Sequence, residues 1–543
     1  MRNKTELTYI YKNTKQFFPI IIFRSLLSCF GAVLLFSFSI LSGRVLDIAM
    51  GEKEGDITLF TCLLFAAIAT YVFFTGFGNH LNTKITARIS HCLQRRLFSA
   101  ICTKKMDKTG GLHSGDILTR FTEDVNAVTR GVSTIIPSVV SFISKIIAGF
   151  SSLFILNPML GLIFLVCGLI FPAISRLVSN KYKYLHKETS RTEGVSRSFL
   201  QECFANMTVI KSFSATLDME NRLSKLQKDN FSFVAKRSIL SVITHIGLYA
   251  VFTVGYYIAL VWGAGQLASG LLTYGTLMAT LQIMSHLRQP LQGITGVIPT
   301  YLSMVASAER ICETLEKEDE PPLLSEPEMT KLKADFKSLD IKNLTFGYSE
   351  KAIFNNANFS VARGDIVAIT GPSGVGKTTL FRLLLGLLEA ESGEILFNER
   401  EKVTASHRGM FAFVPQGNMI LSGSIRENII FVCKDADEEK IIKAAKDAGI
   451  YDFITSLPNG FDTILSERGA GLSEGQIQRI AIARALLTDA PILLLDECSS
   501  ALDEQTEKEL LSHISSLKDK TVLFITHREN VLSICNKQIR LGL

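Results

Sequence analysis

Six long apolar runs in the first part of the chain constrain what it can fold into. A helix crosses the hydrocarbon core of a bilayer with about 20 residues, and each run is long enough to do so. The runs are Phe17–Gly43, Ile57–Gly78, Val132–Leu156, Met159–Ser179, Ser238–Gly263 and Tyr274–Met304. The whole chain has 543 residues, 47% of them hydrophobic, and exceeds the length of one domain. We therefore expect a polytopic α-helical membrane domain with six spans, and at least one further domain.

The charges of the segments between these runs predict how the spans are oriented. Residues 79–131 and 180–237 form two long, basic segments, whereas the short segments carry few basic residues or none. The positive-inside rule then places both termini and both long segments in the cytoplasm of a cell inner-membrane protein. The first run is too long for a cleaved signal, so we expect it to be retained. The net charge of +6 is concentrated in the first half, which argues against nucleic acid as a partner.

Three ionisable side chains are expected deep within the spans. Lys145 is near the middle of the third span, His286 and Arg288 are near the middle of the sixth, and no predicted span contains an acid. A charge in hydrocarbon is costly, and snorkelling to the interface is a long reach from this depth. We therefore expect these three residues to line a water-filled substrate cavity, which favours anionic or amphipathic cargo.

An acidic, proline-rich stretch at residues 316–328 ends the membrane part, so we place its domain at residues 1–310 and a linker at 311–338. Beyond it, residues 339–543 show short strands alternating with helices, which is typical of an α/β domain. We therefore predict a six-span helical membrane domain followed by an α/β domain.

The stretch Asp365–Leu385 has the order strand, glycine-rich loop, helix, which predicts that this second domain is an α/β P-loop ATPase domain. Its loop matches GxxxxGK[ST], in which glycines bring backbone N–H groups close to phosphate oxygens. We expect Lys377 to reach the β- and γ-phosphates of ATP, and Thr378 to offer its hydroxyl to Mg²⁺. The nucleotide-binding residues predicted in this loop are Gly371, Ser373, Gly374, Gly376, Lys377, Thr378 and Thr379.

Five further residues whose side chains suit ATP hydrolysis occur before and after the P-loop in the sequence. Tyr348 can stack on an adenine, and Gln416 can reach Mg²⁺ and the attacking water. Asp496 ends an apolar strand and is suited to hold Mg²⁺ through water, while Glu497 follows it and can polarise that water. His527 follows another apolar strand and can contact the γ-phosphate. Each has an ordinary alternative, such as a surface tyrosine or a stray histidine, but their order together favours catalysis.

The segment Leu472–Gln476, LSEGQ, opens another predicted helix and provides a second anion site. Ser473, the backbone around Gly475, and Gln476 would contact phosphate there. Such a site would contact ATP if a second chain closed over the P-loop. The signature segment of each chain would then complete the ATP site of the other. We therefore expect a dimer, with a homodimer favoured over a heterodimer.

With these motifs in order, the chain resembles an ABC transporter of the exporter type, a half-transporter with one membrane domain fused to one ATP-binding domain. The resemblance covers almost the whole chain. It implies ATP- and Mg²⁺-dependent export across the cytoplasmic membrane by alternating access of a dimer. The matching motifs are the A-loop Tyr348, Walker A Gly371–Thr378, Q-loop Gln416, the segment Ser466–Gly469, signature Leu472–Gln476, Walker B Ile492–Asp496, catalytic Glu497, D-loop Ser500–Asp503 and H-loop His527.

Two further stretches, residues 115–124 and 200–213, resemble the coupling-helix regions of that family. The signature departs from the usual pattern, with Glu474 in place of glycine, which should not abolish hydrolysis. Because the sequence stops soon after His527, we expect the usual C-terminal helices to be missing.

Three functions compete at this point. The leading hypothesis is export of an amphipathic, peptide-like substrate, and the first alternative is a lipid or lipid-linked flippase on the same scaffold. The third, of another class, is an ATP-binding sensor or channel without transport. Glu497 and His527 argue against the third, since both belong to a hydrolytic site.

Overall fold

The computed structural model describes residues 2–106, 114–348, 351–417, 419–466, 469 and 471–542, except for the side chains of some helix positions, chiefly residues 163–180. The chain forms two compact units. Unit 1 comprises Met1–Ser99 and Ser114–Leu315, and unit 2 comprises Ala100–His113 and Glu316–Leu543.

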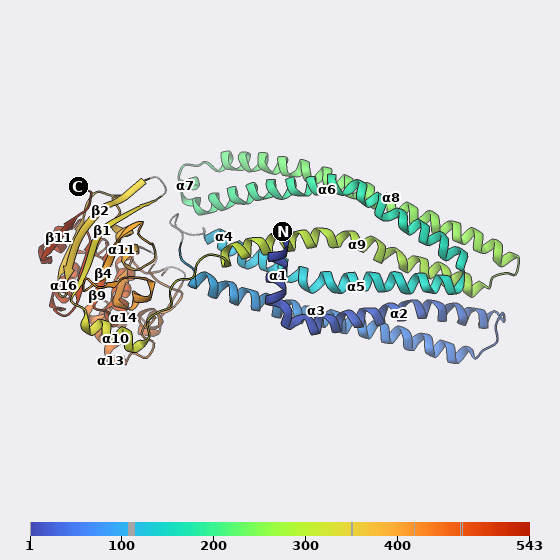
Figure 1. Ribbon diagram of the computed structural model, residues 1–543, viewed down its shortest axis with the longest axis horizontal. Helices are drawn as coiled ribbons and strands as arrows, with labels where there is room; N and C mark the ends of the chain where they lie inside the picture. Colours follow the sequence, from blue (N-terminus) through green and yellow to red (C-terminus); the bar gives the residue numbers. More distant parts are fainter. Residues whose placement is uncertain are drawn as a thin grey trace. The chain divides into compact units, whose positions relative to one another are not determined.

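Unit 1 is helical, and each of the six predicted spans falls within one of its long helices, except that Phe17 at the start of the first span lies in a 3₁₀ turn (Figure 1). In the described part of the chain, three stretches are both long and apolar enough to cross a membrane, namely Thr8–Ala49, Ile57–Thr103 and Ile117–Leu156. The predicted helical membrane domain is therefore confirmed. The long helices are α2 Phe18–Ala49, α3 Ile57–Thr103, α5 Val125–Leu156, α6 Pro158–Ala205, α8 Thr216–Ala268 and α9 Tyr274–Leu315, and α1 Arg2–Thr14 with a 3₁₀ turn Lys15–Phe17 precedes them.

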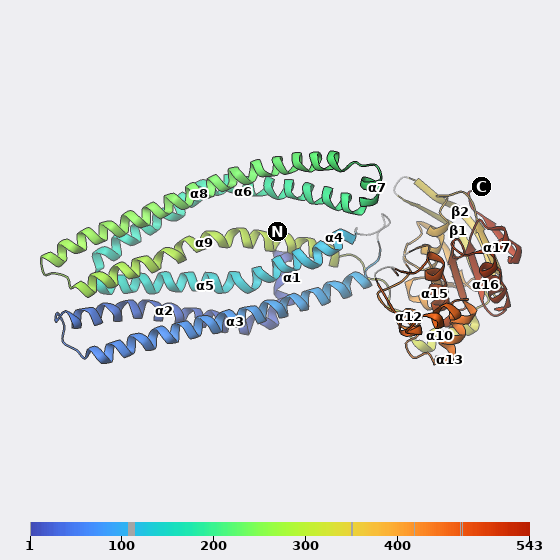
Figure 2. The same cartoon turned by 180° about the vertical axis from the view of Figure 1, so that it is seen from behind.

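All six of these helices are longer than the roughly 20 residues that a bilayer requires, and three of them are the longest. Helices α3, α6 and α8 contain 47, 48 and 53 residues, which at about 1.5 Å per residue is roughly twice the hydrocarbon thickness. The long basic segments between the predicted spans are thus largely helical extensions of the spans. Helices α6 and α8 run side by side and meet at α7 (Figures 1 and 2).

The two stretches that resemble coupling-helix regions, residues 115–124 and 200–213, are the predicted docking stretches, and they differ in the structure. In the second, α7 Met207–Ser212 is a separate short helix, and Ser214 closes its turn with a φ of 54°. In the first, α4 Ser114–Thr119 and a π-helical turn Arg120–Asp124 lead without a break into α5. The first stretch is therefore the beginning of a long helix rather than an independent short one, at least from Ser114 onward.

Helices α2 and α9 approach each other closely where both carry a glycine. A Cβ built on Gly275 would lie 1.8 Å from the carbonyl oxygen of Gly43, so neither position has room for a side chain. One turn further along α2, the carboxylate of Asp47 is buried with 1% of its surface exposed. It accepts hydrogen bonds from Lys53 Nζ at 2.7 Å, Thr273 Oγ1 at 2.9 Å and Gly275 N at 2.7 Å.

This contact joins the turn between α2 and α3 to the start of α9. The N–H groups of the first turn of α9 lack helical partners and favour a negative charge. The Asp47 carboxylate accepts a hydrogen bond from Gly275 N, and Glu52 Oε2 accepts one from Tyr274 N at 3.1 Å. Because the predicted first span ends at Gly43, Asp47 was not expected to be a helical, buried acid.

Replacing Asp47 with alanine should lower the thermal stability of the membrane domain, because three buried or half-buried donors lose their acceptor. An unpaired buried donor costs about 1–3 kcal/mol. The measurement is the melting midpoint of the purified protein in detergent, by loss of the folded elution peak. Glu54→Ala removes an exposed acid from the same turn and serves as the matched control. Equal midpoints for the two variants would contradict the structural role of Asp47.

Unit 2 is built on a five-stranded sheet whose order is β11-β3-β10-β9-β6, with every neighbouring pair parallel. All residues of β9 and β10 are buried, as expected for central strands covered on both faces. Alternate residues of β9 face opposite cores: Leu493 packs in one cluster and Leu494 in the other. The strands are β3 Ile366–Thr370, β6 Phe411–Val414, β9 Ile492–Asp496, β10 Thr521–Ile525 and β11 Lys537–Arg540.

A second sheet has four antiparallel strands in the order β2-β1-β4-β5. Here the prediction of strands alternating with helices from Leu339 onward is wrong locally, because β1 ends at Tyr348 and β2 begins at Lys351. A helical crossover takes a dozen or more residues, so this spacing permits only a hairpin. The strands are β1 Ser338–Tyr348, β2 Lys351–Ala362, β4 Ser392–Phe397 and β5 Glu401–Lys402.

Within the predicted linker the structure has a short helix, α10, which packs on unit 2 through the buried side chain of Leu332. Ser325 and Glu328 cap its first turn reciprocally. The other elements of unit 2 are α10 Glu326–Asp335, α11 Lys377–Leu384, the 3₁₀ helix Ala405–Met410, β7 Gly423–Ser424, α12 Ile425–Ile429, α13 Glu438–Asp447, α14 Tyr451–Ser456, the 3₁₀ turn Gly460–Asp462, β8 Ile464–Leu465, α15 Glu474–Leu487, α16 Glu504–Ser516 and α17 Glu529–Ile534.

Candidate active site

Four neighbouring strands deliver the predicted catalytic residues to one edge of the parallel sheet. The P-loop follows β3, His527 follows β10, Asp496 ends β9, and Gln416 follows β6. The carboxyl ends of parallel strands lie at the same edge, where open α/β sheets bind ligands. The sheet order β3-β10-β9-β6 therefore places these residues side by side, although up to 156 positions separate them in the sequence.

The P-loop has the backbone that phosphate binding requires. Gly371, Gly374 and Gly376 have φ values of 146°, 79° and 108°, a region that side chains with a Cβ rarely adopt. A Cβ on Gly376 would also lie 2.2 Å from Ile353 Cγ2, so glycine is needed there for space as well. Helix α11 begins directly after Gly376, and its free N–H groups point into the loop. Ser373 is exposed at the tip of the loop.

Lys377 is already held at the mouth of the P-loop. Its Nζ donates to the carbonyl oxygens of Gly371 at 2.8 Å and Pro372 at 3.1 Å, and lies 3.1 Å from His527 Nε2. With 8% of its surface exposed, this ammonium group has little water around it. Phosphate oxygens can replace the two carbonyl acceptors with little movement of the side chain, which brings Lys377 and His527 to the same phosphate.

Two of the three side chains predicted to hold Mg²⁺, Thr378 and Asp496, contact each other. Thr378 Oγ1 donates to Asp496 Oδ2 at 2.8 Å. Asp496 is buried with 1% exposure. Burial raises the pKa of Asp496 above its usual range, while the hydrogen bond from Thr378 acts in the opposite direction and lowers it. Hydroxyl and carboxylate oxygens are the ligands that Mg²⁺ prefers. The pair therefore fits the ion, and a bound cation would also favour the ionised form of Asp496.

Glu497 and Gln416, the residues predicted to act on the attacking water, contact each other. Glu497 has a left-handed backbone with a φ of 49°, and its N–H donates to Ile525 O at 3.0 Å. Such strained conformations gather at active sites. Gln416 Nε2 donates to Glu497 Oε2 at 2.5 Å, so a water molecule beside this pair would meet both a carboxylate acceptor and an amide.

Tyr348 lies beside the P-loop helix, at the end of β1. Its hydroxyl is 3.5 Å from Thr379 Oγ1, and its ring packs edge-on against Phe346 at 5.1 Å between centroids. The ring is half-buried. Thr379 is buried at 8% exposure and supports the tyrosine.

The signature segment is ordered in the structure but stands apart from the P-loop. Ser473 and Gln476 cap α15 reciprocally, with Gln476 N donating to Ser473 Oγ at 3.3 Å and Ser473 N to Gln476 Oε1 at 2.8 Å. Gly475 is required for packing, since a Cβ there would lie 2.8 Å from Ala501 O. Among the described residues, no hydrogen bond joins these three to the P-loop. Of the predicted motif Ser466–Gly469, Glu467 and Arg468 lie outside the described residues.

Two residues that sequence reasoning missed tie the motifs of the site together through Ser500. Gln478 Nε2 donates to Ser500 Oγ at 3.1 Å, and Arg528 Nη2 donates to the carbonyl oxygen of Ser500 at 2.7 Å. They link the signature helix and the segment after His527 to the same loop. The sequence carries a signal for Gln478, because this glutamine lies on the apolar side of a predicted helix. In the structure its side chain is buried, with 2% exposure.

In unit 1 the structure separates two of the predicted cavity residues. Lys145 lines a cavity of about 190 Å³ among α2, α3 and α5, together with Arg24. Arg24 Nη1 donates to Ser133 O at 3.0 Å. No Asp or Glu is among the described residues lining this cavity, whose other polar side chains are Ser28, Tyr71, Thr75, Asn79, Ser138 and Ser141.

Arg288 lines a different cavity, of about 210 Å³, between α8 and α9, where its guanidinium lies 4.0 Å above the ring of Tyr249. His286 lines neither cavity and packs against Phe38 at 5.6 Å between ring centroids. Its Nε2 is buried and has no hydrogen-bond partner within the described residues. Within one chain, then, the three residues do not form a single site.

Fold and site together define a P-loop ATPase joined in one chain to a helical membrane domain. The family model for the ABC transporter transmembrane region matches residues 20–291, and the model for the ABC transporter ATPase region matches residues 354–500. The chain belongs to the ABC transporter family, as an exporter with ATP-hydrolysing translocase activity. The predicted resemblance is confirmed.

Individual relatives agree with this assignment. The chain is 31% identical over 502 residues to the "ATP-dependent lipid A-core flippase" of Desulfotalea psychrophila, covering 89% of this chain and 85% of the relative. It is 29% identical to the "Fatty acid ABC transporter ATP-binding/permease protein" of Mycobacterium bovis, covering 77% of this chain and 66% of the relative. A solved bacterial Atm1-family ABC exporter with ATP bound shares the fold, with a TM-score of 0.79, 23% identity and coverage of 97% and 94%.

Proposed function

We propose that this protein moves an anionic lipid out across the cytoplasmic membrane, using ATP and working as a dimer by alternating access. The observation that carries the proposal is that Arg24 and Lys145 line one cavity within the membrane helices. The names of the relatives, a lipid flippase and a fatty acid transporter, support a lipid cargo better than the peptide-like cargo expected first.

The chemistry of this cavity favours a head group. Two cations within the spans need a compensating charge or water, and the described lining contains no acid. A phosphate or carboxylate would supply the missing charge through hydrogen bonds from both side chains. The volume of about 190 Å³ is smaller than the roughly 300 Å³ at which pockets for whole drug-sized ligands begin. The apolar tail of the cargo would therefore remain in the surrounding lipid.

The active site supports a hydrolytic role for the chain's own residues. Lys377 and the P-loop N–H groups bind the phosphates, and Glu497 accepts a proton from the attacking water, which Gln416 orients. Thr378 and Asp496 would hold Mg²⁺, which neutralises phosphate charge when bound. The exposed Ser473 is free to donate its hydroxyl proton to the γ-phosphate on a second chain, because its oxygen serves its own helix only as an acceptor. This complementarity supports the dimer.

Lys145→Gln should weaken stimulation of ATPase activity by an anionic lipid and leave the basal rate largely unchanged. Removing one charged partner of a head group costs about 1.5–3 kcal/mol, so the half-stimulating lipid concentration should rise about tenfold or more. The protein is tested in lipid discs against phosphatidic acid, phosphatidylcholine, an amphipathic peptide and a lipophilic cation. Arg130→Gln removes an exposed cation from the same helix α5 and is the control.

Two outcomes would overturn the proposal. If the peptide or the lipophilic cation stimulates best, the cargo is not an anionic lipid. If phosphatidic acid stimulates both variants equally, the cavity of Arg24 and Lys145 is not the head-group site. Arg288→Gln in the same assay reports on the second cavity, and its effect distinguishes a role for α8 and α9 from one for α2, α3 and α5.

A further inference from the structure

A short segment after helix α3 pairs with the linker that follows α9. Lys105 N donates to Glu318 O at 3.0 Å, and Glu320 N donates to Thr103 O at 2.8 Å, an antiparallel bridge centred on Lys104 and Asp319. The side chains of Lys104 and Asp319 also form an ion pair at 2.9 Å. Because α3 ends at Thr103 and α9 ends at Leu315, the chain leaves two membrane helices and brings both continuations to this one bridge.

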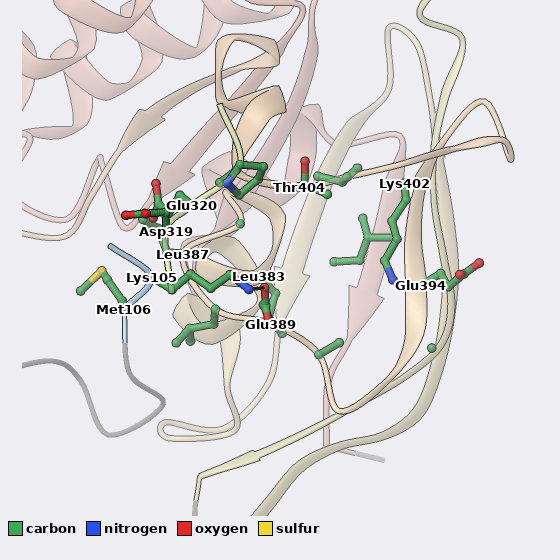
Figure 3. Close-up of a pocket in the computed structure, with 18 residues that line it drawn as sticks. Lys105, Met106, Asp319, Glu320, Leu383, Leu387, Glu389, Glu394, Lys402 and Thr404 are labelled. Carbon is green, nitrogen blue, oxygen red and sulfur yellow. Dashed lines mark ion pairs between the residues drawn. The ribbon is translucent and has the colours of Figure 1, made fainter. Parts of the chain in front are cut away.

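Ion pairs fasten this bridge to the ATPase core. Lys105 Nζ lies 2.8 Å from Glu318 Oε2 in the linker. It also lies 2.8 Å from Glu389 Oε1 (Figure 3), so one ammonium group joins the linker to the segment that follows the P-loop helix. These hydrogen bonds raise the pKa of Lys105, and it stays charged at any physiological pH. A cavity of about 670 Å³ borders these contacts, so polar contacts rather than close packing connect the segments there.

A second connection is more buried and reaches the P-loop helix itself. Arg408 Nη1 and Nη2 bind both carboxylate oxygens of Glu320 at 2.6 and 2.7 Å, and Glu320 is 13% exposed. The same guanidinium donates through Nε to Leu385 O at 3.0 Å and through Nη2 to Gly386 O at 3.3 Å. These are carbonyl groups at the C-terminal end of α11, where a cation is favoured by the helix dipole.

Arg408 is placed to affect both the P-loop helix and the strand that leads to Gln416. Helix α11 has eight residues, a rigid rod of about 12 Å, with Lys377 at its first position and the contact to Arg408 at its far end. Arg408 also lies three residues before β6, the strand that ends just before Gln416. A displacement of Arg408 would therefore move the P-loop helix relative to Gln416 and Glu497.

We propose that Arg408, held by the linker residue Glu320, is a positioning residue for ATP hydrolysis, through which the continuations of α3 and α9 set the geometry of the ATP site. The inference concerns hydrolysis and does not depend on which cargo is carried. It predicts that breaking the pair slows turnover while nucleotide binding is kept, because the P-loop remains intact and only its alignment with Glu497 is lost.

The experiment compares Glu320→Gln, Arg408→Gln and the double variant in the full-length protein in lipid discs. Each single variant should lower basal kcat about tenfold, the scale of a small misalignment, and change the affinity for a fluorescent ATP analogue less than twofold. The double variant should lose no more than either single variant, since both act through one contact. Glu318→Gln removes a linker acid that contacts Lys105 instead of Arg408, and it should retain a larger share of kcat.

The comparison remains decisive if Arg408→Gln does not fold, because Glu320→Gln keeps the arginine on the helix end and can be judged against Glu318→Gln. Arg408→Lys keeps the charge and loses the bidentate contact with Glu320. Its kcat should lie between that of the unaltered protein and that of Arg408→Gln. The proposal is overturned if Glu320→Gln has the kcat of Glu318→Gln, or if kcat losses in the double variant are the product of the single losses. Loss of nucleotide affinity in parallel with kcat would also overturn it, since that indicates a damaged P-loop.

Discussion

ATP turnover should fall by at least about 10²-fold in Glu497→Gln, with ATP binding retained, because the change removes a positioned general base. The glutamine has nearly the shape of Glu497 and keeps contact with Gln416, but it cannot accept the proton of the attacking water. Lys377 and the P-loop, which bind the phosphates, are unchanged. The measurement is phosphate release at saturating ATP, together with equilibrium binding of a fluorescent ATP analogue.

The matched control for this prediction is Glu509→Gln, an exposed glutamate on α16 that lies outside the catalytic edge of the sheet. It should hydrolyse ATP at the rate of the unaltered protein. Phosphate release near that rate in Glu497→Gln would remove Glu497 from its assigned role. Gln416 would then be the first candidate for orienting the water, since it faces the same position.

The second large effect is expected when two inactive chains are combined. Lys377→Ala removes the phosphate-binding cation, and Ser473→Ala removes the signature hydroxyl, so each variant alone should lose most of its activity. A dimer that contains one chain of each kind has one P-loop and one signature intact on opposite chains. If the composite sites form between chains, that mixed dimer recovers one complete site and hydrolyses ATP.

A chain that carries both substitutions is the control. Paired with an unaltered chain, it leaves no complete site if the sites form between chains, but one complete site if each chain is self-sufficient. The two arrangements therefore give opposite activities in the two mixed dimers, which differential tags allow to be purified. Activity in the second mixture and none in the first would contradict the dimer.

Much of the site was readable from the sequence because each motif carries its own local chemistry. The glycines of the P-loop impose a backbone that few other residues adopt, and an apolar strand ending in Asp496 and Glu497 must place those acids at the edge of a sheet. The order of the motifs then restricts the fold. The apolar runs likewise fix the helical membrane domain, because a bilayer sets the length of a span.

The ends of helices and strands were harder to predict from the sequence. The hairpin of β1 and β2 depends on a connection of two residues, which the alternating pattern did not reveal. Similarly, the first docking stretch continues into α5, because nothing in residues 114–125 stops a helix once the neighbouring helices support it. Local propensity is a weak guide at such boundaries, where tertiary packing decides.

Contacts between residues distant in the sequence were settled by the tertiary structure alone. Asp47 and Gly275 are 228 positions apart, and Glu320 and Arg408 are 88 apart, so no local pattern could pair them. The same holds for the cations in the membrane. Sequence determined that Lys145 and Arg288 lie within spans, whereas the packing of α2, α3 and α5 against each other, and of α8 against α9, placed the two residues in different cavities. A side chain's depth follows from its position in a helix, but its neighbours follow from which helix faces meet.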